Sequence, residues 1–237
     1  MIKDYFIFGG INSGDYGVIV EEAAVFDKPA ASLSTVKVPG RNGDLILYEN
    51  RFENVKISYK CHCDYHFRSR LDGLIKRLSS QKGYKRLEDS VYPKYFRRAY
   101  FQGPVSPKLL RTYRAGSFQL SFAADPRKFL KTGEIAMPAF TAAGVILNEH
   151  GFDALPLIRC YGTSGTVTIN GVAVTVTGCT SYVDIDCDLM ETYEGSTSRN
   201  GTTTLVNGEF PVLSDGENTV SFTGFSRVEI TPRWWIL

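Results

Sequence analysis

The chain has 237 residues, of which 43% are apolar and 22% are charged, and this length suits one large or two ordinary domains. The composition argues against a largely disordered chain, and the lack of any run of about 18 apolar residues argues against a membrane-spanning helix. The net charge of +2 conceals a division, because residues 1–131 carry 23 basic and 13 acidic side chains, whereas residues 132–237 carry 4 and 12. We therefore predict two domains, 1–131 and 132–237.

The N-terminal segment and the cysteines indicate where the chain folds. Met1–Phe8 has no basic region followed by a long apolar run, so we expect no signal peptide. The cysteines are odd in number and scattered, unlike a disulfide framework. We expect them to be free, mostly buried thiols in a protein that folds in a reducing cytosol. They are Cys61, Cys63, Cys160, Cys179 and Cys187.

A projecting hairpin is predicted over residues 36–47, where two apolar arms flank a short polar tip that contains glycine. Such a hairpin is either an ordinary surface feature or an arm that packs on a neighbouring subunit. We take its tip as the first candidate subunit interface. The tip residues are Pro39, Gly40, Arg41, Asn42 and Gly43.

The first domain is predicted to be rich in strands, with one packed helix. Residues 55–63 alternate apolar with polar side chains, as a half-buried strand does, and residues 117–122 alternate in the same way. Between them, His66–Gly83 has apolar residues at helical spacing, and Gly83 is expected to provide a left-handed cap. The apolar stripe of this helix consists of Phe67, Leu71, Leu74, Ile75 and Leu78.

A basic segment that contains several aromatic residues follows, between Lys76 and Arg98. This mixture is compatible with a nucleic-acid surface, with a solvated helix face that runs into a loop, or with a charged subunit interface. No nucleic-acid-binding fingerprint accompanies it. We take part of the segment as the second candidate subunit interface. The residues chosen are Lys85, Arg86, Tyr95, Arg97 and Arg98.

The second domain is predicted to be an antiparallel β-sandwich. Its clearest hairpin runs from Thr166 to Val176, where Asn170-Gly171 suits a type I′ turn. Pairing Ile169 with Val172 brings four apolar side chains to one face, so register and hydrophobicity agree. Residues 133–148 are predicted to be a connector between the domains. Further strands are predicted at Tyr182–Cys187, Thr219–Phe222 and Val228–Ile230, with a turn at Asp215-Gly216.

The metal-capable residues do not follow a recognised metal motif. Cys61-His62-Cys63 with His66 lacks the spacing of a zinc site, and alternation along a strand would turn His62 away from both cysteines. Asp184, Asp186 and Asp188 resemble the start of a calcium loop, but the glycine and the closing glutamate of an EF-hand are missing. We interpret the aspartates as the acidic solvent face of a strand and leave open a weak cation site.

No catalytic motif is found. The chain lacks a nucleophile elbow, a phosphate loop, a dinucleotide fingerprint and the H-E-x-x-H motif. We therefore predict that the protein is not an enzyme and that it has no catalytic, cofactor or metal residues. Trp234 and Trp235, next to Arg233, are expected to point one inward and one outward, with the outer ring covering a domain junction, a neighbour or a sugar.

Taken in order, a series of short motifs resembles the distal tail proteins of siphophages and prophages of Gram-positive bacteria. Each motif is weak alone, and the resemblance extends over nearly the whole chain. In the first domain the motifs are Asn12-Ser13, residues 38–43, Gly83-Tyr84, Leu87-Glu88-Asp89, Gly116-Ser117-Phe118 and Asp125-Pro126. In the second domain they are Asn148, Gly151, Pro156, Asn170-Gly171, residues 208–211, residues 216–218 and residues 232–235.

This resemblance implies a mainly β fold and a structural role. The N-terminal domain is expected to be β-barrel-like or a split barrel with one α-helix, and six copies are expected to form the ring of a baseplate hub. The C-terminal domain is expected to be a galectin-like sandwich outside that ring. Implied partners are the tail tube protein, the tail-associated lysin or hub protein and a receptor-binding protein. The ring would contact nucleic acid only as the genome passes through it, with no membrane partner and no cofactor.

The resemblance also implies a location, and it leaves one alternative function open. The subunit is expected in the virion tail tip, after folding and assembly in the host bacterial cytoplasm. The alternative is a lectin-like, carbohydrate-binding module for host adhesion. Sugar-binding galectins gather His, Asn, Arg and Trp on one sheet face, whereas the second domain contains only one histidine, His150, and four arginines. We therefore favour the scaffold.

Overall fold

The computed structural model describes residues 4–22, 28–110 and 114–237 and divides the chain into two compact units. Unit 1 comprises Met1–Lys128 with Leu237, and unit 2 comprises Phe129–Ile236. The first three residues of the N-terminal segment considered above lie outside the described residues. In the described part of the chain, no helix has both the length and the apolarity that a bilayer span requires.

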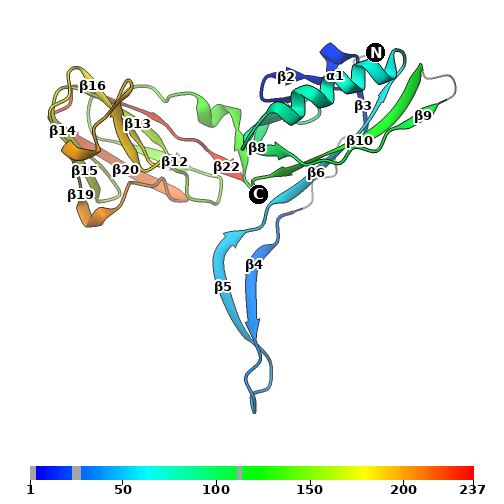
Figure 1. Cartoon of the computed structure of the whole chain (residues 1–237). Helices are drawn as coiled ribbons and strands as arrows, with labels where there is room; N and C mark the ends of the chain where they lie inside the picture. The colour runs from blue at the N-terminus through cyan, green and yellow to red at the C-terminus, as the bar shows by residue number, and fades with distance from the viewer. Residues whose placement is uncertain (1–3, 23–27, 111–113) are drawn as a thin grey trace. The chain divides into compact units, whose positions relative to one another are not determined.

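Unit 1 is built on an antiparallel sheet with the strand order β2-β1-β7-β8-β10-β6-β3, and β9 also pairs with β10 (Figure 1). The long strand predicted over residues 55–63 is confirmed as β6, and its burial alternates along its whole length. The strand predicted at 117–122 is confirmed within β10. The bounds are β1 Phe6–Phe8, β2 Ile11–Asn12, β3 Ile19–Glu22, β6 Val55–Cys63, β7 Lys85–Asp89, β8 Tyr95–Phe101, β9 Lys108–Leu110 and β10 Ala115–Ala124.

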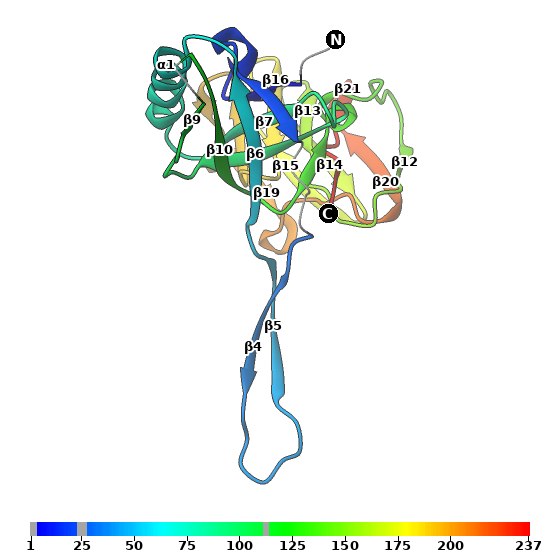
Figure 2. The same ribbon diagram turned by 90° about the vertical axis from the view of Figure 1, so that its right-hand side faces the viewer.

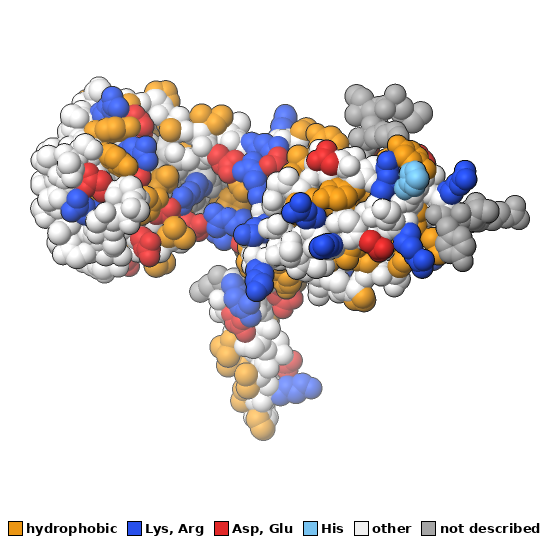
Figure 3. All heavy atoms as spheres, turned by 45° about the horizontal axis from the view of Figure 1, so that its top comes forward, with side chains coloured by type: hydrophobic (Ala, Val, Ile, Leu, Met, Phe, Trp, Pro, Cys, Tyr) orange, Lys and Arg blue, Asp and Glu red, His pale blue; other side chains and the backbone are white. Residues whose placement is uncertain are grey.

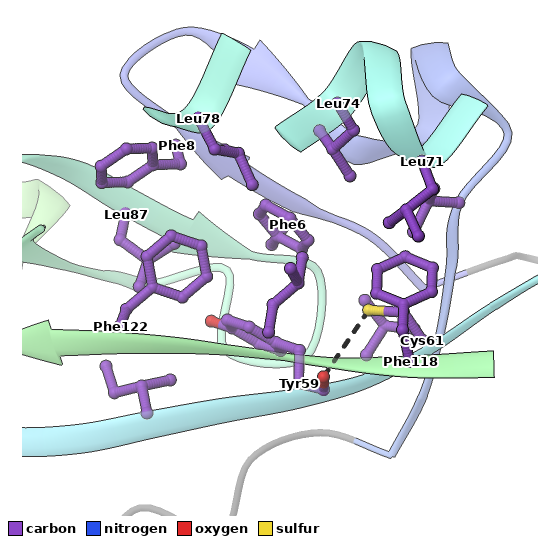
Figure 4. Close-up of a cluster of buried hydrophobic side chains, with 14 of the residues drawn as sticks. Phe6, Phe8, Tyr59, Cys61, Leu71, Leu74, Leu78, Leu87, Phe118 and Phe122 are labelled. Atoms are coloured by element: carbon purple, nitrogen blue, oxygen red, sulfur yellow. Dashed lines mark hydrogen bonds between the residues drawn. The ribbon is translucent and has the colours of Figure 1, made fainter. Parts of the chain in front are cut away.

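One face of this sheet is covered by α1 (Phe67–Ser80), and the unit 1 core lies between them (Figure 4). The predicted stripe is confirmed, since Phe67, Leu71, Leu74 and Leu78 are buried and Ile75 is partly buried. The predicted cap is wrong in position: the helix ends at Ser80 and is capped by Gln81, whose N–H donates to the Leu78 carbonyl, whereas Gly83, which has the expected left-handed φ of 70°, lies two residues beyond the cap. From the sheet, Phe6, Phe8, Tyr59 and Phe122 form an aromatic cluster under the helix.

A separate two-stranded sheet consists of β4 (Ala31–Val36) and β5 (Leu45–Phe52), which we call the hairpin arm. Figures 1 and 2 show the arm standing apart from the sheet of unit 1. The predicted hairpin is therefore confirmed, but its strands extend further from the tip than the apolar pattern indicated. The tip is the loop of residues 37–44. A bulge between Ala31 and Leu33 shifts the register near its base.

Unit 2 contains two five-stranded antiparallel sheets, with the orders β12-β20-β14-β15-β19 and β18-β17-β16-β13-β21. Their inward side chains form a second core, so the predicted sandwich is confirmed. β11 and β22 pair with each other. Short 3-10 helices are η1 Ser13–Tyr16 in unit 1 and, in unit 2, η2 Lys131–Glu134, η3 Asn200–Thr202 and η4 Val206–Gly208. The strand bounds are β11 Lys128–Leu130, β12 Gly144–Asn148, β13 Leu157–Tyr161, β14 Gly165–Ile169, β15 Val172–Val176, β16 Tyr182–Asp186, β17 Glu191–Glu194, β18 Thr197–Ser198, β19 Thr203–Leu205, β20 Gly216–Thr223, β21 Arg227–Thr231 and β22 Trp235–Ile236.

The predicted Asn-Gly hairpin has the expected turn and register. Ile169 pairs with Val172 and Val167 with Val174, and both turn residues have positive φ, 50° at Asn170 and 84° at Gly171. A type I′ turn requires this conformation, which glycine adopts without strain and asparagine tolerates. The neighbouring strands also follow the sequence pattern, with β16, β20 and β21 at the predicted positions.

Three details of unit 2 differ from the sequence prediction. Residues 144–148 of the predicted connector form strand β12, whose Ile146 side chain enters the core of the sandwich. Asp184 and Asp186 are buried, so β16 has no acidic solvent face. Both tryptophans are half-buried within unit 2, because Trp234 packs on the core and Trp235 stacks on Phe152 at 4.4 Å.

Candidate functional site

The hairpin arm exposes apolar side chains on both of its faces. Cross-strand pairing places Val36 beside Leu45 and Leu33 beside Tyr48, and alternation sends these two pairs to opposite faces. Tyr48 is 69% exposed, and most of the other apolar residues are about half exposed (Figure 3). An isolated two-stranded hairpin is only marginally stable in water. The exposed apolar residues are Leu33, Val36, Val38, Leu45, Ile46, Leu47 and Tyr48.

The first predicted interface lies at the tip of this arm. Two glycines there have positive φ, 80° at Gly40 and 82° at Gly43, which lets the tip loop reverse direction. The Arg41 N–H donates to the Val38 carbonyl and forms a local turn. All five predicted residues, Pro39, Gly40, Arg41, Asn42 and Gly43, are exposed.

The second predicted interface falls on β7 and β8, but its residues do not share one face. Arg86 pairs opposite Arg98, and Leu87 opposite Arg97. Because Leu87 is buried under the helix, alternation turns Arg97 and Tyr95 to the core side, and Arg86 and Arg98 to the other face. The Arg86 guanidinium lies 3.8 Å from the Phe96 ring centroid and pairs with Glu88.

Arg97 is 5% exposed, and it lies among buried polar groups. Burial lowers the pKa of the Arg97 guanidinium, and the opposing influences come from Tyr59, Asp125 and Asp89. The Tyr59 hydroxyl donates to Asp89 at 3.1 Å, and burial raises the pKa of this tyrosine well above its usual value. The position of Arg97 therefore favours a role in holding β8 inside unit 1.

The face of the unit 1 sheet opposite α1 is polar. Lys56, Ser58 and Lys60 of β6 alternate with the buried residues of that strand, so they lie on the face away from the helix. Their partners on β10, among them Ser121 and Gln119, continue the surface. A groove of about 420 Å³ is lined by Lys56 and Lys60 of β6 and by Gln119 and Ser121 of β10, together with Glu21 of β3. We call this surface the polar face; its residues are Lys56, Ser58, Lys60, Ser117, Gln119 and Ser121.

A second groove of unit 1, of about 530 Å³, lies beside α1. On the helix side it is lined by Leu71 and Ile75, and on the other by residues 101–107. Its lining includes the apolar side chains of Phe101 and Val105, with Asp72 and Lys76 at the margin. The groove therefore offers an apolar lining on the surface of unit 1, as the hairpin arm offers exposed apolar side chains.

In unit 2, the outer face of the sheet with β13, β16 and β21 gathers aromatic and charged side chains. Tyr161 lies opposite Tyr182 on one side and Arg227 on the other, and Arg159 lies between Asp184 and Glu229. The guanidinium groups of Arg227 and Arg159 cover the rings of Tyr161 and Tyr182 at 3.9 and 4.8 Å. We call this surface the tyrosine face. Its residues are Tyr161, Tyr182, Tyr193, Arg159, Arg227, Asp184 and Glu229.

The aspartates that resembled a calcium loop are engaged by arginines. Arg159 binds Asp184 at 2.7 and 2.8 Å, and Arg233 binds Asp186 at 2.6 and 2.7 Å, both through two hydrogen bonds. The remaining capacity of Asp186 is used by the N–H groups of Asp188 and Leu189. Within the described residues, no group of His, Cys, Asp and Glu side chains is arranged to hold a metal ion.

The cysteines are free and buried, as the sequence indicated. Burial raises the pKa of the Cys61 thiol to about 12, and the same cause raises that of Cys187 to about 12. The Cys61 thiol donates to the Tyr59 carbonyl at 3.8 Å inside the core (Figure 4). Such thiols carry almost no thiolate at neutral pH.

The fold is that of a phage distal tail protein. Over 96% of this chain and 97% of the other, it matches the crystal structure of Dit from phage SPP1, with a TM-score of 0.76 and 14% sequence identity. That protein is described as a paradigm of the hub adsorption apparatus of phages that infect Gram-positive bacteria. Neither a family model nor a curated protein matches the sequence. The resemblance predicted from the order of short motifs is therefore confirmed by the fold.

Proposed function

We propose that the chain is a structural, non-enzymatic subunit of a phage tail tip. In this proposal six copies form a ring that joins the tail tube protein to the tail-associated lysin or hub protein and can hold a receptor-binding protein. The observation that carries it is the fold match over both units, to a protein described as a hub. The number six comes from the family resemblance.

The hairpin arm is the proposed ring contact. Both of its faces are apolar, and neither is covered by the described residues of the chain itself, since its large side chains are exposed. Covering them on a neighbouring copy would stabilise both the arm and the ring. The groove beside α1 is its proposed seat, because Ile75, Phe101 and Val105 offer an apolar lining. A head-to-tail contact of this kind closes into a ring when the rotation is suitable.

Mass photometry with electron microscopy tests the ring. Six chains of 26.4 kDa would give a particle of about 158 kDa. The double variant Ile46→Asp/Leu47→Asp charges both faces of the arm and is expected to leave folded monomers, with a circular dichroism spectrum like that of the wild type. Ser221→Asp, on an exposed position of β20, is the control and should keep the ring. A wild-type protein that stays monomeric at every concentration would refute the proposal.

The polar face is the proposed channel wall for passage of the genome. Its serines and Gln119 are uncharged, and the lysines are spread between them, so a duplex would be attracted without base-specific contact. We expect no stable complex with duplex DNA in a gel-shift assay at physiological ionic strength. A strong shift that weakens with salt would instead favour a nucleic-acid-binding function for unit 1.

A lectin-like function is the second candidate, and the tyrosine face favours it. Three tyrosines and two arginines lie together there, although they are far apart in sequence. Arginine already covers the rings of Tyr161 and Tyr182, which leaves less ring surface for a sugar. We therefore rank the scaffold function above the lectin function. A glycan array of cell-wall sugars tests this function. A saturable hit that Tyr161→Ala abolishes would reverse the order.

A further inference from the structure

The sandwich has an unprotected edge at β12. This strand ends its sheet and pairs only with β20 among the described residues. Edge strands are normally shortened, covered or charged, because they otherwise pair with other chains. From Thr141 to Asn148 the chain contains no charged residue and no proline. Val145 and Leu147 point outward from the sandwich and are 56% and 53% exposed.

The other edges of the same sandwich are protected. Strand β21 is covered by the segment 137–140, since Met137 donates to the Ile230 carbonyl and Phe140 exchanges two backbone hydrogen bonds with Val228. Strands β18 and β19 are only two and three residues long. By contrast, β12 has five uncharged residues and no covering segment among the described residues, so it differs from β18 and β19 in length and from β21 in charge and cover.

The register shows which backbone groups β12 leaves at the edge. Thr219 of β20 donates its N–H to the Asn170 side chain, and its carbonyl accepts from the Asn170 N–H. Both groups of Thr219 therefore point away from β12. Val145 lies opposite Thr219, so this pair is not hydrogen-bonded, and the N–H and carbonyl of Val145 face the free edge. By alternation, those of Leu147 do so as well.

We propose that β12 pairs antiparallel with β12 of a second copy of this chain. A two-fold axis at Ile146 places Val145 of one copy opposite Leu147 of the other. The backbone N–H and carbonyl groups of these residues, which face the free edge, then face each other. Each such pair can then exchange both of its backbone hydrogen bonds. The outward side chains of these residues come together on the same face and lose their exposed apolar surface.

Charge does not oppose this contact at the strand itself. On the outer face, the acidic Glu217 lies opposite Leu147 on β20, and the exposed Glu149 follows β12 two positions after Leu147. In the paired sheet the two copies of Glu217 would be three strand spacings apart, about 14 Å, which exceeds the Debye length of about 8 Å at physiological salt. A charged or proline-containing edge would lack this self-complementarity.

A contact through five residues is small, so single copies would pair weakly. A ring that presents several such edges would pair much more strongly, because the contacts act together. The double ring that follows, of about 317 kDa, rests on the proposed function, whereas the strand pairing does not. The full-length protein would show rings and double rings if both proposals hold, and monomers and dimers if only the pairing holds.

Sedimentation velocity over a concentration series, with four forms of the full-length chain, tests the pairing. Leu147→Lys places a charge at the edge, and Val145→Pro removes the N–H that faces it without touching the ladder to β20. We call the association of two chains or two rings through β12 doubling. Each of these two variants should raise the dissociation constant of doubling by about tenfold or more. Thr219→Lys puts the same charge on the same face, one strand inward, and should double like the wild type.

Several results would overturn the pairing. One is a wild-type protein that never doubles, whether or not it forms rings. Another is an equal loss of doubling in Thr219→Lys and Leu147→Lys, which would assign the effect to charge alone. Circular dichroism shows whether each variant is folded. If Val145→Pro is unfolded, the comparison of Leu147→Lys with Thr219→Lys tests the pairing.

Discussion

Asn in place of Asp186 should destabilise unit 2 strongly. The Asp186 side chain is 3% exposed, and it holds Arg233 through two short hydrogen bonds. Arg233 is itself held in a left-handed conformation with φ of 57°, and its N–H donates to the Gly133 carbonyl. The ion pair therefore fixes the C-terminal segment to the strand β16. Asp186→Asn removes the negative charge and leaves this guanidinium without its counter-ion.

The magnitude follows from the burial of the two partners. Removing one partner of a buried ion pair costs about 3–5 kcal/mol. Arg233 keeps 22% of its side chain exposed, so water can partly replace the carboxylate, and we expect about 3 kcal/mol, near the lower limit. For a unit of this size that corresponds to a fall in melting temperature of about 12 °C or more.

Thermal unfolding monitored by circular dichroism measures this effect, and Glu229→Gln is the matched control. The Arg227–Glu229 pair is longer, at 3.6 Å, and both side chains are more exposed, so its loss should cost less than about 1 kcal/mol. Equal shifts in the two variants would refute the argument that burial makes the Asp186 pair strong.

The same pair predicts a dependence on pH. Burial alone would raise the pKa of Asp186, but hydrogen bonds from Arg233, Leu189 and Asp188 outweigh it and hold the pKa below its ordinary value. The unfolded chain therefore binds this proton more readily than the folded one. The stabilisation is present above a pH of about 4 and is lost as the pH falls through the lower folded pKa. The difference between the wild type and Asp186→Asn should shrink in acid.

Three further variants or probes test the packing of both units. Leu74→Ala removes a fully buried side chain from α1 and should cost about 2–5 kcal/mol in urea unfolding. Gly116→Ala would bring a methyl group within 2.8 Å of both the Lys108 carbonyl oxygen and the Phe67 ring, and it should cost about 1–3 kcal/mol by the same measurement. Because the pKa of the Cys61 and Cys187 thiols is about 12, neither should react with a disulfide reagent at pH 8 until denaturant is added, and rapid native labelling would contradict their burial.

Local patterns predicted the elements whose partners lie nearby in the sequence. The strand β6 and the helix α1 follow from the alternation and the helical spacing of their own residues. The Asn170-Gly171 hairpin follows from a turn that only a few residue pairs allow. In each case one segment contains both the pattern and the structure it causes.

The remaining features depend on partners that are remote in the sequence. Asp186 and Arg233 are 47 residues apart, and nothing in the local pattern of β16 shows that a guanidinium covers its carboxylate. The position of Arg97 under the helix follows from the register of β7 and β8. Strand β12 lies in an Ala-, Gly- and Thr-rich stretch that resembles a linker, and only its pairing with β20 makes it a strand.

The division of charge between the units distinguishes two of the proposed contacts by their dependence on salt, namely the β12 pairing and the contact of the polar face with nucleic acid. All four arginines of unit 2 pair with a carboxylate of that unit, so its acidic excess lies with the other carboxylates. Two such units repel each other when their β12 edges meet. Added salt screens this repulsion, so it should strengthen the doubling. Contact of the basic polar face with a nucleic acid releases counterions and should weaken with salt. An association that grows with ionic strength therefore points to β12, and one that declines points to the polar face.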